Sequence, residues 1–254
     1  MAPRKLKFAF VSLTSCEGCY FELLGLREKF VELKDKIDVV EFRLFADDEL
    51  DEQDKIDVVF IEGSPVTTAN INALDRLRAQ SQLVVAYGSC AHIGGIYHMK
   101  NYSQRERLME HVYAPESNLE NPEIFPVQHY IKVDFNLPGC PVTKDEILRF
   151  IYAIVDGKYP MIKQNPVCYE CFLRGNECLL QKGEICLGPI TVGGCQAICL
   201  TSGQACWGCR GLLRDPQIDN WITILKEKGF TQSHINEVLK VFGVKDLIEA
   251  RKDN

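Results

Sequence analysis

The distribution of cysteine is the feature that most constrains how this chain can fold. Of its 12 cysteines, four precede residue 141 and the others lie between Cys168 and Cys209. Glycine and proline are scattered through that second stretch and long apolar runs are few, so side chains alone cannot build much of a core there. Bound metal holds many small domains of this kind together. The change in cysteine density predicts one domain over residues 1–160 and another over residues 161–254.

The sequence also indicates the cellular compartment. The apolar stretch from Phe8 to Leu13 is too short for the core of a signal peptide, and the chain has no twin-arginine pair and no apolar run long enough to span a membrane. We therefore expect a cytoplasmic protein that does not enter the membrane. Thiols stay reduced in the cytoplasm, where clustered cysteines bind metal more often than they form disulfides. The net charge of -6 argues against a nucleic-acid partner.

The first half of the chain alternates apolar strand-like runs with segments of helical spacing. Strands are predicted over residues 6–13, 39–45, 56–61, 83–87 and 131–137, and helices over residues 20–33, 67–77 and 142–155. Near-continuous apolar strands separated by helices are typical of a parallel sheet covered on both faces. The fold class is therefore α/β, and the segment from residue 94 to 128 shows no regular pattern.

Four cysteines follow the predicted strands at the point where each strand ends. Cys16 and Cys19 follow the first strand, Cys90 follows the fourth and Cys140 follows the fifth. Because the carboxyl ends of parallel strands meet at one edge of a sheet, and ligands bind in the crevice outside it, these thiols are expected to converge. Four thiolates are the ligand set of a [4Fe–4S] cluster.

Two of these cysteines have a simpler interpretation. Cys90 and Cys140, taken singly, could be small buried side chains in the core. Each follows closely after a glycine, Gly88 or Gly139, and glycine lets the backbone approach a bulky cluster. That context favours ligands.

The loop after the third strand, Glu62-Gly63-Ser64-Pro65, carries no cysteine but should lie beside the same crevice. Glu62 could contact a partner or transfer protons. Alternatively, the loop only starts a helix, with Ser64 as its N-cap and Pro65 in its first turn. We favour this second interpretation.

The cysteine-rich tail has the spacing Cys168-x2-Cys171-x6-Cys178-x7-Cys186, followed by Cys195-x3-Cys199-x6-Cys206-x2-Cys209. These cysteines could form two zinc sites or two iron–sulfur clusters. The irregular spacing favours a small ferredoxin-like domain wrapped around two clusters, although it does not match the common two-cluster ferredoxin run. Beyond the tail, apolar positions over residues 221–225 and 235–242 predict two helices that cover this domain.

Taken in order, these motifs identify a resemblance. Cys16-Glu17-Gly18-Cys19, Glu62-Gly63-Ser64, Gly88-Ser89-Cys90, Pro138-Gly139-Cys140-Pro141 and the tail resemble the small subunit of [NiFe] hydrogenases over about residues 6–210. The resemblance implies a flavodoxin-like first domain and three [4Fe–4S] clusters. It assigns the proximal cluster to Cys16, Cys19, Cys90 and Cys140, the medial cluster to Cys195, Cys199, Cys206 and Cys209, and the distal cluster to Cys168, Cys171, Cys178 and Cys186.

Two positions distinguish branches of that family. Membrane-bound relatives have histidine where Cys168 stands, and often a proline near Cys199 that leaves a three-iron medial cluster. Here both positions are cysteine. The resemblance therefore implies three all-thiolate clusters, with lower reduction potentials than those of the membrane-bound relatives. It places the chain in the soluble cytoplasmic branch, which includes sulfhydrogenase delta subunits and the gamma subunits of coenzyme F420-linked hydrogenases.

The function that this resemblance implies is electron relay. Electrons would pass between the nickel–iron centre of a large-subunit partner and a reductase partner that contains flavin or iron–sulfur clusters. The chain has no Asp-Pro-Cys motif of the kind that binds nickel in large subunits, so it should not split hydrogen by itself. Glu17, between the first two cysteines, is expected to be an ordinary surface residue.

Two other functions remain possible from the sequence. The chain could be a relative of the complex I subunit that holds the last cluster of that enzyme, although those proteins have two adjacent cysteines at the first motif and lack the cysteine-rich tail. It could also be a non-catalytic scaffold stabilised by zinc.

Overall fold

The computed structural model describes residues 4–44, 54–113, 119–120 and 122–252. The chain divides into two compact units, Met1–Met161 and Ile162–Asn254. This division lies one residue from the boundary that the cysteine density predicts. No helix among the described residues combines the length and the apolar character needed to cross a bilayer.

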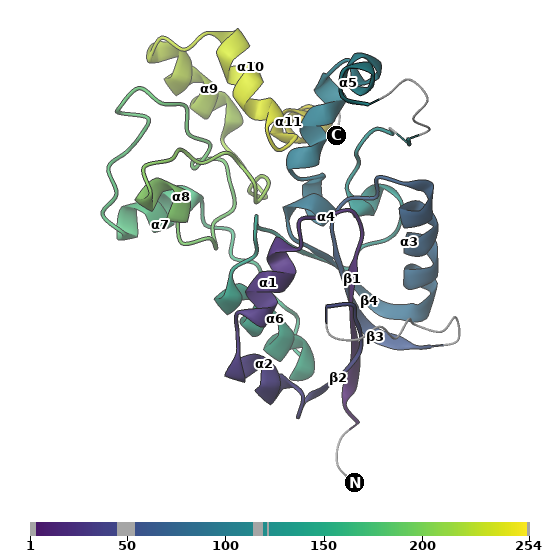
Figure 1. Ribbon diagram of the computed structural model, residues 1–254. Helices are drawn as coiled ribbons and strands as arrows, with labels where there is room; N and C mark the ends of the chain where they lie inside the picture. Colours follow the sequence, from purple (N-terminus) through teal and green to yellow (C-terminus); the bar gives the residue numbers. More distant parts are fainter. Residues whose placement is uncertain (1–3, 45–53, 114–118, 121, 253–254) are drawn as a thin grey trace. The chain divides into compact units, whose positions relative to one another are not determined.

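The first unit is built on one parallel sheet of five strands (Figure 1). The strands are β1 (Leu6–Ser12), β2 (Ile37–Phe42), β3 (Ile56–Glu62), β4 (Ser81–Tyr87) and β5 (Phe135–Leu137), in the spatial order β2-β1-β3-β4-β5. This is the flavodoxin-like order of doubly wound sheets, in which the winding direction reverses between β1 and β3. The predicted fold class is confirmed.

Helices cover both faces of this sheet, and side chains that alternate along the strands pack against them. Phe10 and Phe60 stack with their ring centroids 5.0 Å apart, on the face covered by Tyr20 of α1 (Gly18–Leu24) and Phe150 of α6 (Lys144–Val155). On the other face, Val59 and its neighbours form a core with Leu74 and Leu77 of α3 (Thr68–Gln80). In Figure 1, α1, α2 (Glu28–Leu33) and α6 lie on one side of the strands and α3 on the other.

The structure corrects three of the predicted elements. The helix expected over residues 20–33 is two helices, because Arg27 adopts a left-handed φ of 53° that interrupts the helical hydrogen bonding. The fifth strand is shorter than expected, since a carboxylate oxygen of Asp134 accepts the Val84 amide N–H at 2.8 Å in place of a backbone carbonyl. The segment around residues 94–128 contains η1 (Ile96–Tyr102), α5 (Arg105–Val112) and η2 (Val127–His129), preceded by α4 (Ser89–Ile93).

The second unit consists mainly of loops and short helices. The cysteine-rich part contains only α7 (Val167–Leu173) and α8 (Ile198–Thr201) among its described residues, and α9 (Ile218–Glu227), α10 (Gln232–Lys240) and α11 (Val244–Lys252) follow. Its core joins Trp221, Leu225 and Ile235 of these last helices to Leu187 and Ile190 of the cysteine-rich part. The two predicted C-terminal helices are present, and α11 is a third that the sequence analysis did not predict.

A stability prediction follows from the carboxylate of Asp134, which accepts the Val84 amide N–H and a second hydrogen bond from an arginine. Arg78 of α3 donates to Asp134 at 2.6 Å. Although desolvation opposes it, hydrogen bonds from Arg78 and Val84 hold the pKa of Asp134 below its usual range. A carboxylate whose pKa is lowered by folding stabilises the protein above its unfolded pKa and ceases to do so as the pH falls through its folded pKa.

We therefore expect Asp134→Asn to reduce the free energy of unfolding by about 1–3 kcal/mol at neutral pH. The difference from the wild type should shrink as the pH falls below about 4, where the carboxyl of the unfolded chain is protonated. Urea unfolding across this pH range measures both effects. Asp75→Asn removes an exposed carboxylate from the same helix as Arg78 and is the control. Equal unfolding curves for the two variants would contradict the prediction.

Candidate metal-cluster sites

The first candidate site lies at the carboxyl edge of the sheet. Cys16 is in the loop after β1, Cys19 is in the first turn of α1, Cys90 is in α4 and Cys140 is in the loop after β5. Burial, together with the neighbouring Cys140 and Cys16, raises the pKa of Cys90 to about 12. Burial, Glu62 and two of these neighbours, Cys140 and Cys90, also raise the pKa of Cys19. The structure thus brings Cys16, Cys19 and Cys140 within electrostatic range of Cys90.

Two glycines leave the space that two of these sulfur atoms occupy. Gly88 has a φ of +87°, and a Cβ at this position would lie 2.5 Å from Cys19 Sγ. Gly95 has a φ of +62° and would place a Cβ 2.5 Å from Cys90 Sγ. The sequence analysis identified Gly88 but missed Gly95. Gly139 differs from expectation, because the nearest atoms to a Cβ there would be backbone atoms of its own loop, the first of them Pro141 O at 2.7 Å.

The loop after β3 holds the Cys19 segment in place. Glu62 is 2% exposed and accepts the Cys19 amide N–H at 3.1 Å, while the Tyr87 hydroxyl donates to the Cys19 carbonyl at 2.6 Å. Burial raises the pKa of Glu62 to about 7, against the opposing effect of the Cys19 N–H. Glu62 therefore supports the start of α1, and no signal in the sequence pointed to Tyr87.

The prediction that Ser64 and Pro65 begin the next helix is wrong. The N-cap of α3 is Thr67, which accepts a hydrogen bond from the Asn70 amide in a capping box. The Ser64 hydroxyl bonds instead with the carbonyls of Cys90 and Gly94, each at 3.2 Å. This serine thus positions the segment that carries Cys90.

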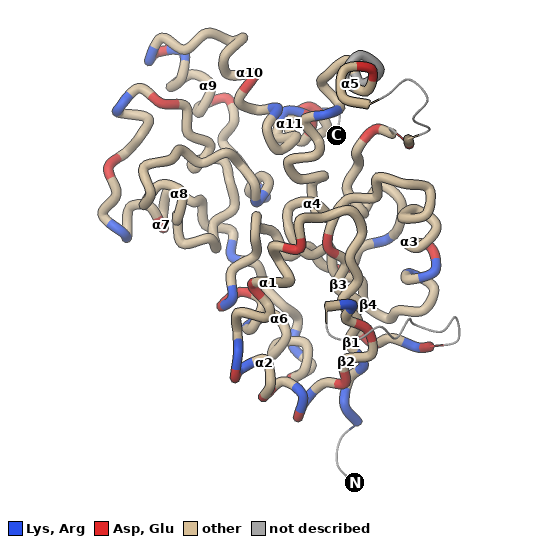
Figure 2. The backbone as a smooth tube through the Cα atoms, viewed as in Figure 1, with Lys and Arg blue, Asp and Glu red and all other residues tan. Residues whose placement is uncertain are grey.

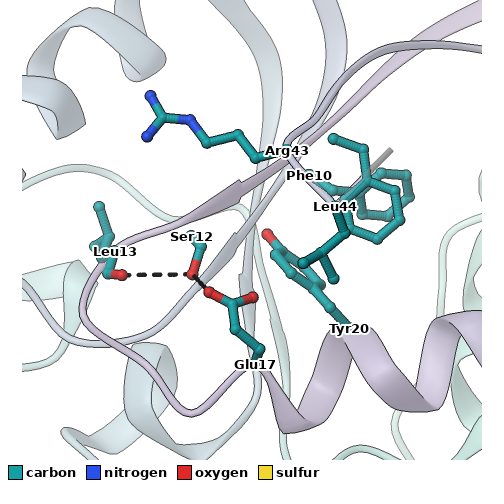
Figure 3. A pocket seen from close by; sticks show the side chains of 8 residues that line it. Phe10, Ser12, Leu13, Glu17, Tyr20, Arg43 and Leu44 are labelled. Atoms are coloured by element: carbon teal, nitrogen blue, oxygen red, sulfur yellow. Dashed lines mark hydrogen bonds between the residues drawn. The ribbon is translucent and has the colours of Figure 1, made fainter. Parts of the chain in front are cut away.

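Glu17 is not the ordinary surface residue that the sequence analysis predicted. It is half-buried and has a left-handed φ of 61°. Its carboxylate accepts a hydrogen bond from the Ser12 hydroxyl, which also contacts the Leu13 carbonyl (Figure 3). The carboxylate lines a pocket at the ends of β1 and β2, together with Tyr20 and Arg43. Glu17 therefore fixes the loop that carries Cys16.

A second group of thiols gathers in the C-terminal unit. Burial, together with Cys186, Cys171 and Cys178, raises the pKa of Cys168 to about 12. These four cysteines are the set that the resemblance assigns to one cluster. Gly188 approaches them closely, since a Cβ there would lie 3.2 Å from Cys168 Sγ and 3.5 Å from Cys186 Sγ.

The other four cysteines lie on two segments that the backbone pairs. The Val192 amide donates to the Gly211 carbonyl at 3.1 Å, which places the segment before Cys195 beside the segment after Cys209. Burial raises the pKa of Cys195, and Cys199 contributes to the rise. Burial and Cys209 likewise raise the pKa of Cys206.

The chemistry of these donors suits iron–sulfur clusters. None of the 12 cysteines, all of which the structure describes, is in a disulfide. Burial raises the pKa of six of them and so favours their protonated form, whereas a bound metal would favour the thiolate. These six are Cys19, Cys90, Cys168, Cys186, Cys195 and Cys206. Among the residues that the structure describes, no three His, Cys, Asp or Glu side chains converge on a site for a single metal ion. A [4Fe–4S] cluster separates its four cysteines by its own iron and sulfide atoms and so does not need that convergence.

A doubly wound sheet with four thiols at its carboxyl edge defines a class of cluster-bearing redox proteins, and the chain belongs to one of its families. It is a member of the family described as NADH ubiquinone oxidoreductase, 20 Kd subunit, which matches residues 16–154. The match begins at the first cysteine of the sheet edge and includes all four.

The particular relatives are hydrogenase subunits. The chain is 36% identical over 224 residues to the sulfhydrogenase 2 subunit delta of Pyrococcus furiosus, covering 87% of this chain and 93% of the relative. It is 31% identical over 241 residues to a subunit of the F420-non-reducing hydrogenase vhu of Methanocaldococcus jannaschii, covering 83% of each chain. These relatives confirm the resemblance to hydrogenase small subunits.

Solved structures agree with this assignment. A chain of the NAD+-reducing [NiFe]-hydrogenase in its H2-reduced state superposes with a TM-score of 0.56 at 27% identity, covering 63% of this chain and 96% of the other. The actinobacterial-type NiFe-hydrogenase of Ralstonia eutropha, at 18% identity and a TM-score of 0.59, covers 99% of this chain and shows that the fold is shared.

Proposed function

We propose that this chain is the electron-transfer small subunit of a [NiFe] hydrogenase. The observation that supports it is the grouping of the thiols into three sets. Four lie at the sheet edge, Cys168 has three others near it, and four lie on the paired segments of the tail. In this assignment Cys16, Cys19, Cys90 and Cys140 hold the proximal cluster. Cys195, Cys199, Cys206 and Cys209 hold the medial cluster, and Cys168, Cys171, Cys178 and Cys186 hold the distal one.

The cysteine-rich tail favours this function over a complex I-type subunit. The family match ends at residue 154, before the tail begins, so it does not distinguish the two. The hydrogenase relatives extend over 83–87% of the chain, which is more than the first unit alone can supply. A subunit that relays electrons needs the additional clusters that such a tail can bind.

Each residue set has a defined part in this proposal. The clusters, when bound, would accept and release single electrons without changing the protein's covalent structure. The cysteines hold them, and the buried position of Cys19 and Cys206 keeps water from their thiolates. Glu62, Ser64 and Tyr87 act through the backbone, because their hydrogen bonds fix the segments that present Cys19 and Cys90.

The exposure of the ligands supports two partners. Cys16 and Cys140 are exposed, so the first site reaches the surface where a large subunit with a nickel–iron centre would bind. Cys178 is also exposed, which suits electron exchange with a flavin- or iron–sulfur-containing reductase subunit. Twelve cysteines that form no disulfide suit a reducing compartment, and we place the complex in the cytoplasm.

Anaerobic purification of the full chain with its copurifying subunits tests this function. We expect about 12 iron atoms per chain, the content of three cubane clusters, together with EPR signals after reduction. We also expect mass spectrometry to identify a nickel-containing partner. A colourless protein that contains zinc and no iron would contradict the proposal and favour the zinc scaffold.

A further inference from the structure

The segment that carries the last cysteines has an unusual distribution of charge. Residues 185–209 contain no Asp, Glu, Lys or Arg, and the long uncharged run of the C-terminal unit is visible in Figure 2. Arg210 ends this run, directly after Cys209. It is 1% exposed, and an arginine side chain remains protonated in a protein. A permanent positive charge is therefore buried within the C-terminal unit.

Arg210 connects the two segments on which the medial ligands are placed. Its Nε donates to the Val192 carbonyl at 3.1 Å and to the Gly193 carbonyl at 3.0 Å. These carbonyls stand just before Cys195, whereas Arg210 follows Cys209. The side chain thus links the backbone just before Cys195 to the residue just after Cys209.

The charge of Arg210 lies beside the cysteines of this set. Its guanidinium group donates to the Gly193 carbonyl, two residues before Cys195, and Arg210 directly follows Cys209 in the chain. Glu170 is an opposing charge, because it accepts the Gly194 amide N–H at 2.7 Å and its carboxylate lies 4.0 Å from Cys195 Sγ. Negative charge at this position is therefore stabilised by Arg210 and destabilised by Glu170.

We propose that Arg210 is a positioning residue for the medial cluster, and that its buried charge raises the reduction potential of that cluster. The inference rests on the proposed function, because it requires a cluster on Cys195, Cys199, Cys206 and Cys209. Reduction adds one electron to the cluster and makes it one unit more negative, with no bond formed or broken. A fixed positive charge nearby stabilises the reduced form more than the oxidised form.

The test is a potentiometric titration of the purified complex with dithionite, followed by EPR, on the wild type and Arg210→Gln. We expect one cluster signal to shift to a more negative potential. The expected change is about tenfold in the ratio of reduced to oxidised cluster at a fixed potential, or about 59 mV for one electron. Arg214→Gln, which removes an exposed arginine from the same unit, should leave all signals unshifted.

Two further variants separate charge from structure. Arg210→Lys keeps the charge and should keep the potential, while Glu170→Gln should shift the same signal in the positive direction. Unshifted signals in Arg210→Gln at full iron content would overturn the inference. Loss of iron from both Arg210→Gln and Arg210→Lys would overturn the role of the charge, because the hydrogen bonds of the arginine, which lysine cannot reproduce, would then account for its effect. If only Arg210→Gln lost iron, the requirement for charge would be supported.

The wild type distinguishes failure of this inference from failure of the proposed function. A wild-type chain without iron would contradict the function itself. A wild type with its clusters, and variants whose potentials do not change, would contradict only the role of Arg210.

Discussion

Replacing Gly88 with alanine should remove about four iron atoms per chain, the content of one cubane cluster, and leave the iron of the C-terminal unit bound. The new Cβ would lie 2.5 Å from Cys19 Sγ, well inside van der Waals contact. The backbone cannot move away easily, because the Gly88 amide donates to the Leu137 carbonyl at 2.9 Å. The sulfur must therefore move, and a displaced thiolate no longer fits a cluster with fixed geometry.

Gly157→Ala is the matched control for this prediction. Gly157 also has a positive φ, +68°, but nothing lies within 4 Å of the position of its added Cβ. Both variants place an alanine at a positive φ, and the strain is larger at Gly88, whose ψ of 169° belongs to a region that almost only glycine adopts. Only Gly88→Ala also disturbs a thiol. Iron analysis and EPR of both variants separate the two effects, and full iron content in Gly88→Ala would show that the loop yields without cost to the site.

Much of the sheet and its cysteine edge could be predicted from the sequence because the relevant signals are local. The strand β3 is buried along its whole length, so its residues form an uninterrupted apolar run. A cysteine that follows such a run must lie at the carboxyl edge of a parallel sheet. Cys16, Cys90 and Cys140 could be placed by this argument without any knowledge of their contacts.

What the sequence did not reveal depends on contacts between distant segments. Tyr87 reads as the last residue of an apolar strand, yet its hydroxyl holds the carbonyl of Cys19, 68 residues away. Gly95 belongs to a segment without a regular pattern, and its closeness to Cys90 follows from the turn after α4. Arg210 resembles any basic residue beside a loop until its burial is known. Such residues have no periodicity that sequence analysis can detect.

The second large effect is expected at Trp221 in the C-terminal unit. This side chain is 2% exposed, and its indole N–H donates to the Cys186 carbonyl at 3.0 Å. It therefore links α9 to a segment that carries a candidate ligand of the distal cluster. Trp221→Ala should lower the free energy of unfolding by about 3–5 kcal/mol, the usual cost of removing a large aromatic side chain from a core.

Trp221→Phe divides this effect into packing and hydrogen bonding. Phenylalanine fills most of the space but leaves the Cys186 carbonyl without its donor, at an expected cost of about 1–3 kcal/mol. The control is Ile224→Ala on the same helix, because Ile224 is 44% exposed and should contribute little. Chemical unfolding of the C-terminal unit in the intact chain gives the energies, and iron analysis shows whether the cluster sites survive.

The order of iron loss tests the link between this helix and the cluster. If α9 supports the Cys186 segment, Trp221→Ala should lose iron at lower denaturant concentrations than the wild type, and Trp221→Phe should fall between them. The iron at the sheet edge should be retained equally in all three proteins, since its ligands belong to the first unit. If the C-terminal unit retained its iron equally in the wild type and both Trp221 variants, the Cys186 segment would keep its structure without Trp221. The bound clusters themselves, and not the helical core, would then stabilise this unit.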